Sequence, residues 1–232
     1  MVFVVAEIGV NWNGDFEIVQ DMMINAKEAR CDAVKFQSFE PKMLAEHPKF
    51  EILKNCSVLE NNIEKIDSIA RSVGIEWFST PMFSKAIEFL DDYVTKYKIR
   101  TFDGRPLLEN KKTELFEKII KTGKTIFVSC ENSPKNSLFY KNPQIDWLYC
   151  VSKYPCDFWD LDFRNVSEYD GYSNHCPHIL APLTAAILGS KIIEIHITSD
   201  KSKNFADNNV SFNYQELKEL VNLIRISEKI TR

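Results

Sequence analysis

The sequence predicts a parallel (β/α)8 barrel, the TIM-barrel fold, made by a single domain. Three observations lead to this prediction: short apolar runs recur along the chain, most of them finish on a polar residue, and segments with helical periodicity separate them. Eight runs match the number of strands that a barrel needs. Polar residues at the strand ends are typical of a barrel that carries its chemistry at one rim.

The eight predicted strands alternate with amphipathic segments along nearly the whole chain. The strands are expected at 2–8, 33–37, 76–80, 97–101, 125–129, 147–152, 170–175 and 191–196. Apolar residues three and four positions apart predict helices at 16–29, 59–70, 84–93, 113–122, 179–188 and 214–228. Segment 131–146 has two prolines and no apolar stripe, so we expect the fifth helix to be shortened or missing. The sixth helix, near 160–167, is also expected to be short.

Length and composition narrow the class of protein. A chain of 232 residues suits one barrel domain spanning 1–232. The net charge of −4 and the lack of a basic stripe argue against nucleic-acid binding. The first residues lack the basic flank and the long apolar run of a signal peptide, so we expect a cytoplasmic protein with no membrane contact. Six cysteines without a Cys-x-x-Cys pair indicate reduced thiols.

Lysines inside two predicted strands are the first sign of a binding site. Lys35 and Lys98 would be costly to bury without an anionic partner, and together with serines at strand ends they suggest a bound phosphate or carboxylate. The alternative is that Lys35 simply pairs with Glu7 on the neighbouring strand. Residues two apart on a strand share a face, and the polar pairs of this kind are Lys35 with Gln37, Ser173 with His175, and Glu194 with His196.

Two histidines close the series of strand-end polar residues. His175 and His196 come from adjacent predicted strands and could reach one divalent metal ion, with Glu7 or Asp207 nearby. The alternative is that each histidine only makes structural hydrogen bonds.

These residues stand in local contexts that resemble the N-acetylneuraminate (sialic acid) synthase family. The matching segments occur in family order and span most of the chain. They are AEIGVNWNG at 6–14, DAVKFQ at 32–37, FSTP at 78–81, KI at 98–99, VS at 128–129, CVSKYP at 150–155, GYSNH at 171–175, IEIH at 193–196, and Asp207 followed by Ser211.

The resemblance implies a reaction and a role for each matched residue. The family condenses phosphoenolpyruvate with an N-acyl amino-sugar aldehyde to give a 2-keto-3-deoxy sugar acid such as a sialic acid, and phosphate leaves by C–O cleavage. The matched catalytic residues would be Glu7, the favoured acid/base, with His196 and Asp207. The implied substrate-binding residues are Lys35, Gln37, Lys98, Ser129, Ser152, Tyr154 and Ser173. His175 and His196 would ligate a divalent metal, Mn²⁺ ahead of Mg²⁺, Co²⁺ or Zn²⁺.

Several positions depart from the family pattern. Trp12 and Asn174 stand where the family usually has histidine and aspartate. The predicted elements finish with the eighth helix, whereas the resemblance implies a further C-terminal antifreeze-like domain in full-length relatives. We therefore expect the sugar side of the site to be either open to solvent, with weak activity in isolation, or closed by loop 40–57, by a homodimer or by a partner protein. A barrel that binds phosphoenolpyruvate or a sugar acid without turnover, as a regulatory or assembly subunit, is the alternative function.

Overall fold

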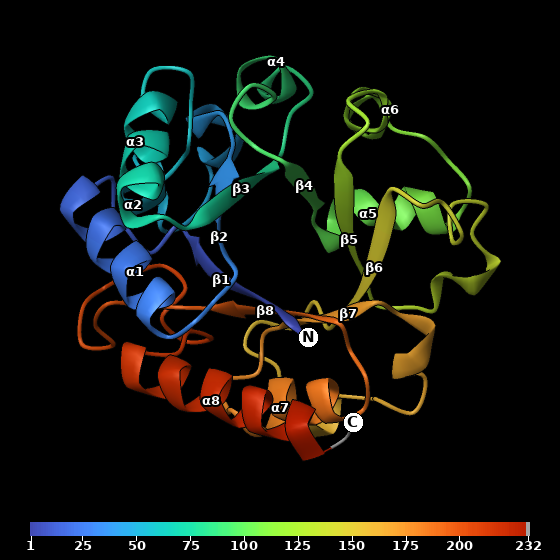
Figure 1. Ribbon diagram of the computed structural model, residues 1–232. Helices are drawn as coiled ribbons and strands as arrows, with labels where there is room; N and C mark the ends of the chain where they lie inside the picture. The colour runs from blue at the N-terminus through green and yellow to red at the C-terminus, as the bar shows by residue number, and fades with distance from the viewer. Residues whose placement is uncertain (231–232) are drawn as a thin grey trace.

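The structure is a computed structural model that describes residues 1–230, and it forms a closed barrel of eight parallel strands in sequence order (Figure 1). All eight predicted strands are confirmed, with small shifts at their ends. They are β1 (Phe3–Gly9), β2 (Ala33–Ser38), β3 (Glu76–Pro81), β4 (Lys96–Ile99), β5 (Thr125–Cys130), β6 (Ile145–Cys150), β7 (Gly171–Asn174) and β8 (Ile192–His196). The barrel closes where β1 pairs with β8.

Helices cover the outside of this barrel, and their ends follow local sequence signals. They are α1 (Phe16–Glu28), α2 (Phe50–Leu53), α3 (Ile63–Val73), α4 (Ala86–Leu90), α5 (Thr101–Leu108), α6 (Glu114–Lys121), α7 (Leu180–Ile187) and α8 (Tyr214–Ile230). Asp15 begins α1 by accepting a hydrogen bond from the backbone N–H of Glu17, and Thr113 caps α6 on Phe116. In Figure 1, α8 runs beside α7 below β7 and β8.

Two of the connections have short 3₁₀ turns in place of an α-helix. The segment after β5 has only the turn η2 (Pro134–Asn136), and the segment after β6 has η3 (Phe158–Asp160) and η4 (Val166–Glu168). The prediction of a missing fifth helix and a short sixth one is confirmed.

The prediction for the fourth strand was wrong at its end. The strand stops at Ile99, and α5 begins at Thr101. This helix contains Gly104 and Pro106, which weaken helical propensity. It forms because it packs directly on β5: a Cβ at Gly104 would lie 2.7 Å from the carbonyl oxygen of Ser129. Tertiary packing therefore overrides a weak local signal.

The barrel interior is divided into an apolar layer and a polar layer above it. Phe127 contacts both Phe3 and Phe78 edge-to-face, with ring centroids 6.2 and 5.6 Å away. Two residues further along these strands come polar side chains such as Thr80 and Ser129, because inward-facing positions alternate. The aromatic cluster thus closes the barrel from below and leaves the polar residues at the carboxyl end.

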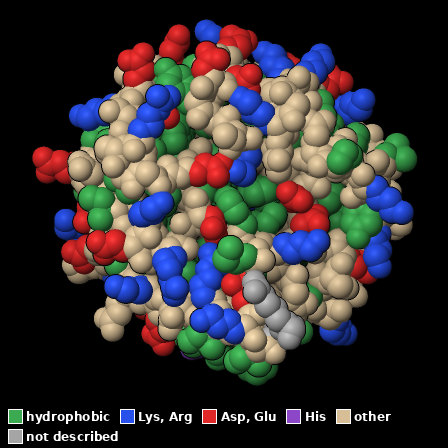
Figure 2. All heavy atoms as spheres, viewed as in Figure 1, with side chains coloured by type: hydrophobic (Ala, Val, Ile, Leu, Met, Phe, Trp, Pro, Cys, Tyr) green, Lys and Arg blue, Asp and Glu red, His purple; other side chains and the backbone are tan. Residues whose placement is uncertain are grey.

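The exposed surface carries charges of both signs. In Figure 2, Lys and Arg side chains are interspersed with Asp and Glu across the face shown. Within residues 1–230, no helix combines the length and the apolar character needed to cross a membrane.

Candidate active site

A cavity of about 460 Å³ opens at the carboxyl ends of the strands and gathers most of the predicted site residues. They come from β1, β2, β4, β5, β7 and β8 and from three of the loops that follow the strands. Those that line the cavity are Glu7, Lys35, Gln37, Lys98, Ser129, Tyr154, Ser173, His175, His196 and Asp207. One polar cavity therefore brings together residues that lie up to 200 positions apart in the sequence.

Strand register explains why these side chains meet. Glu7 pairs with Lys35 on β2 and with His196 on β8, so the three residues lie in one layer of the barrel. Ser173 pairs with Glu194 in the same way. Because the barrel closes between β1 and β8, the first and last strands contribute neighbouring groups.

The floor of the cavity is a buried network of two lysines and two glutamates. Lys35 Nζ lies 2.9 Å from Glu7 Oε2 and 3.8 Å from Glu194 Oε2, and Lys98 Nζ lies 2.8 Å from Glu194 Oε1. Ser173 Oγ donates to the same Glu194 oxygen at 2.8 Å. All four charged side chains are at most 4% exposed. Glu194 thus joins both lysines into one unit.

Burial and charge pairing move the pKa values of these four groups in different directions. Burial raises the pKa of Glu7, and repulsion from Glu194 adds to this, although Lys35 opposes it. Burial acts against the ionised form of Glu194 as well, but Lys35 and Lys98 outweigh it and lower its pKa to about 2. Glu194 is therefore the firmly ionised carboxylate, and Glu7 is the one suited to hold and release a proton.

The two lysines also differ. Burial works against the charge of Lys35, yet Glu194 and Glu7 together raise its pKa. Burial lowers the pKa of Lys98, and Glu194 only partly compensates. A bound anion would favour the charged form of both lysines.

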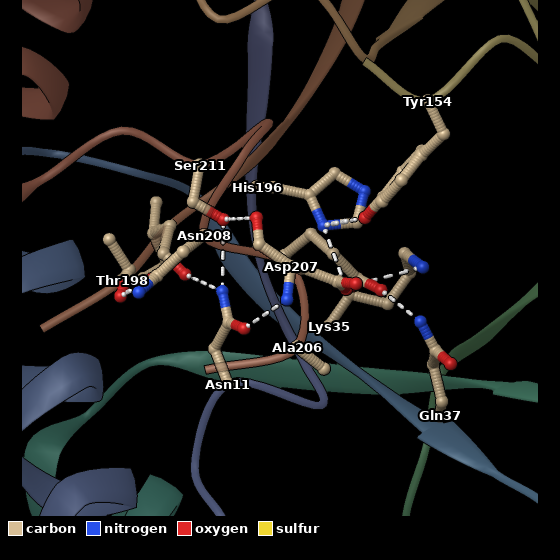
Figure 3. Close-up of polar contacts among 12 residues, drawn as sticks. Asn11, Lys35, Gln37, Tyr154, His196, Thr198, Ala206, Asp207, Asn208 and Ser211 are labelled. Atoms are coloured by element: carbon tan, nitrogen blue, oxygen red, sulfur yellow. Dashed lines mark hydrogen bonds and ion pairs between the residues drawn. The ribbon is translucent and has the colours of Figure 1, made fainter. Parts of the chain in front are cut away.

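Two histidines and two oxygen-bearing side chains form the upper wall of the cavity. The rings of His175 and His196 are 5.5 Å apart between centroids. His196 Nδ1 lies 3.4 Å from Asp207 Oδ2 and 3.5 Å from the hydroxyl of Tyr154 (Figure 3). Burial opposes ionisation of Asp207, but hydrogen bonds from His196 and Tyr154 hold its pKa below the ordinary value.

The imidazole hydrogen bonds are compatible with a metal ion. His175 Nδ1 lies 2.7 Å from the carbonyl oxygen of Val151, which can only accept, so this nitrogen carries a proton, and in the neutral ring Nε2 keeps its lone pair. The Nδ1 of His196 faces the carboxylate of Asp207. Metal-binding histidines are commonly oriented by such bonds at the other ring nitrogen. In the part of the chain that the structure describes, no three His, Cys, Asp or Glu side chains form a ready metal-binding cluster.

One predicted binding residue lies outside the cavity. Ser152 is exposed, and its backbone N–H donates to Glu131 Oε1 at 3.3 Å. The reason is that β6 ends at Cys150, so the inward-outward alternation that would have aimed Ser152 into the barrel does not reach it. Cys150, the last residue of the strand, lines the cavity.

The prediction of site residues also missed several groups that line the cavity. Glu194 was recognised only as sharing a face with His196, and its position two residues before that histidine was the available signal. Thr80 accepts a hydrogen bond from Lys35 Nζ at 2.8 Å. Thr101 lines the cavity at the first position of α5, a helix that was not predicted.

The loop between β2 and α3 covers part of the mouth of the cavity. Its residues Leu44, His47, Lys49 and Leu53 line the opening, and Lys49 Nζ donates to the carbonyl oxygen of Ala206 at 2.8 Å. Trp12 lies beneath this loop, where its indole N–H donates to the carbonyl oxygen of Cys56 at 3.1 Å.

Fold and site together define the class of protein: a TIM barrel whose carboxyl end holds a lysine–glutamate floor and a pair of histidines. Comparison with known sequences makes the class specific, because the sequence pattern of the NeuB family matches residues 22–232. The chain belongs to the NeuB family.

Individual relatives agree with this assignment. The chain is 31% identical to the N,N'-diacetyllegionaminic acid synthase of Legionella pneumophila, over 98% of this chain and 72% of that protein. It is 29% identical to the N-acetylneuraminate-9-phosphate synthase of Mus musculus, over 98% of this chain and 70% of the relative. Its fold is similar to the crystal structure of the N-acetylneuraminic acid synthetase of Leptospira borgpetersenii, with a TM-score of 0.85, 24% identity, and coverage of 99% of this chain and 84% of that one.

Proposed function

We propose that the protein condenses phosphoenolpyruvate with an N-acyl amino-sugar aldehyde, giving a 2-keto-3-deoxy sugar acid of the sialic acid kind and free phosphate. Its relatives include synthases named for legionaminic acid and for N-acetylneuraminate 9-phosphate. The observation that carries the proposal is the cavity floor, where two buried lysines lie with the hydroxyl group of Ser129, which has no hydrogen-bond partner within residues 1–230.

The floor combines three features that suit a phosphate or carboxylate. Ser129 Oγ is buried without a hydrogen-bond partner in the described chain. The N-terminus of α5 lies at the cavity with no side-chain cap, so its first N–H groups and its dipole favour an anion there. Lys35 and Lys98 share the firmly ionised carboxylate of Glu194, and a bound anion would favour the charged form of both lysines.

The proposed reaction forms one C–C bond and breaks one C–O bond. The π electrons of phosphoenolpyruvate form a bond from carbon 3 to the aldehyde carbon, and the aldehyde oxygen takes up a proton. Water adds to carbon 2, forming a new C–O bond and releasing one proton. The C2–O bond to phosphate then breaks as the new hydroxyl gives up its second proton, which leaves the keto group and free phosphate. Glu7, whose pKa is raised by burial, is placed to transfer protons, and Asp207 with Tyr154 faces the sugar side.

We also propose that His175 and His196 hold a divalent ion, Mn²⁺ in the first place. Such an ion would polarise the aldehyde oxygen. With two protein nitrogens as ligands, further positions remain for water and substrate oxygen. A second copy of the chain or a partner protein is proposed to complete the cover over the sugar, because Tyr154 is still 43% exposed.

The test is phosphate release from phosphoenolpyruvate with a panel of N-acyl amino-aldoses, with and without Mn²⁺, in H₂¹⁸O. We expect release only when both substrates and the metal are present, with the label in the keto acid and none in phosphate, because the C–O bond breaks. Label in phosphate would indicate simple phosphatase cleavage. Glu7→Gln serves as the matched variant and should abolish turnover while phosphoenolpyruvate still binds.

The alternative is a barrel that binds without turnover. Its signature would be binding of phosphoenolpyruvate by calorimetry, with no phosphate released for any aldose or metal. The raised pKa of Glu7 favours catalysis, since a simple anion binder has no use for a proton-transfer group beside its anion site.

A further inference from the structure

Asn11 is a fully buried amide in the turn that follows β1, and its side chain makes hydrogen bonds to the segment after β8. Its Oδ1 accepts a hydrogen bond from the backbone N–H of Asp207 at 2.9 Å (Figure 3). Its Nδ2 donates to the carbonyl oxygen of Ile197 and to Ser211 Oγ, each at 2.9 Å. These three bonds join the beginning of the barrel to a segment about 190 residues later.

The same contacts hold Asp207 on both sides of its backbone. The backbone N–H of Asp207 donates to Asn11 Oδ1, and Ser211 Oγ donates to the backbone carbonyl oxygen of Asp207 at 2.7 Å. Ser211 Oγ in turn accepts a hydrogen bond from Asn11. With both backbone groups held, the carboxylate is directed to His196 and Tyr154. A loop residue thereby gains a position as defined as that of a strand residue.

We propose that Asn11 is the positioning residue for Asp207 and acts on catalysis through that carboxylate alone. The catalytic part rests on the proposed synthase function. Buried hydrogen bonds that leave unpaired groups when broken are costly, so loss of the Asn11 amide shifts the Asp207 backbone. A displacement of about 1 Å at a reacting group can lower the rate about 100-fold.

The neighbouring Asn208 provides the matched control. It lies in the same loop, and its amide also makes several hydrogen bonds, two of them half-buried and two exposed. Its partners are Thr198, Asp200, Lys201 and Lys203, which stabilise the far side of the loop. Asn208→Ala should therefore loosen the loop without releasing Asp207.

The kinetic test is a double-mutant cycle between Asn11→Ala and Asp207→Asn. We expect Asn11→Ala alone to lower kcat about 10- to 100-fold, with the KM for phosphoenolpyruvate changed less than about twofold. In the Asp207→Asn background the same change should alter kcat less than about twofold. Additive losses, or an equal loss of kcat in Asn208→Ala, would overturn the proposal, because a merely structural amide does not depend on Asp207. If Asn11→Ala does not fold, Ser211→Ala takes its place in the cycle, with the same expectation and the same overturning result.

A second readout needs no substrate. Amide hydrogen exchange should speed up in Asn11→Ala at residues 207–211, and in Asn208→Ala at 198–204 instead. Unchanged protection at 207–211 in Asn11→Ala would overturn the inference. If the unmodified protein releases no phosphate in the assay above, the proposed function fails, and the exchange experiment still decides whether Asn11 holds Asp207.

Discussion

The floor and the mouth of the cavity are built by different means. At the floor, Lys35, Lys98 and Glu194 lie on strands, and each is directed inward by alternation and held by ion pairs of 2.8–3.8 Å. At the mouth, Tyr154 and Asp207 lie on loops and depend on individual hydrogen bonds. The strands of the barrel therefore fix each floor residue through several contacts at once, whereas a residue at the mouth can shift when one hydrogen bond is lost.

The largest effect is expected at Glu194. Glu194→Gln removes the ionised partner that both buried lysines share, and unpairing a buried charge costs about 3–5 kcal/mol of unfolding free energy. Urea denaturation measures this loss. Glu51→Gln, which breaks an exposed pair with Lys54, should cost less than about 1 kcal/mol. Equal losses in the two variants would show that the floor network contributes no more than a surface pair.

The same network predicts a pH dependence. The pKa of Glu194 falls from its ordinary 4.5 to about 2 on folding, so its ionised form stabilises the protein above pH 4.5. That stability is lost as the pH falls from 4.5 through about 2, when the folded protein must take up the proton. The melting temperature, measured across this pH window, should fall more steeply in the unmodified protein than in Glu194→Gln. Parallel curves would contradict the assignment of this acid response to Glu194.

A smaller effect is expected on ligand affinity, where the buried Lys35 should matter and the half-exposed Lys201 should not. Lys35→Met should weaken phosphoenolpyruvate binding about 10- to 100-fold, since a charge-assisted hydrogen bond in a buried site contributes about 1.5–3 kcal/mol. Lys201→Met removes a half-exposed lysine that pairs with Glu216, and it should leave the affinity within about twofold. Calorimetry on the folded variants gives both values. Comparable losses would place the anion away from the floor.

How well each region could be predicted from the sequence follows the same division. The apolar runs predicted all eight strands, and the polar residues within or just after β1, β2, β4, β5, β7 and β8 were correctly expected to share one cavity. Alternation is a local rule, so it needs no knowledge of distant contacts. Ser152 failed because the rule was extended two residues beyond the end of β6.

The features that were not predicted are helix α5 and the contact that positions Asp207, a residue that was itself expected in the site, and both depend on contacts between distant segments. Helix α5 forms although it contains Gly104 and Pro106, because that glycine allows close packing on Ser129. Asp207 reaches the cavity through a hydrogen bond to Asn11, 196 residues earlier. Neither a propensity nor a periodicity carries this information, so the loop geometry at the mouth could be known only from the folded chain.

The smallest predicted effect concerns Trp12, which lies beneath the loop that covers the mouth. Its indole packs against Phe16 and Phe36 and donates to the Cys56 carbonyl, so it supports the loop that covers the mouth. Trp12→Phe keeps an aromatic ring but leaves that carbonyl without its donor, at a cost of about 1–3 kcal/mol.

The consequence should be confined to the mouth. Hydrogen exchange in Trp12→Phe should rise at residues 40–57 and stay unchanged in β2 and β8, and the affinity for phosphoenolpyruvate should not change. The KM for the proposed sugar substrate should increase, since the loop residues His47 and Lys49 line the opening of the cavity. Faster exchange in the strands, or weaker phosphoenolpyruvate binding, would show that the floor and the mouth are energetically coupled and do not respond independently.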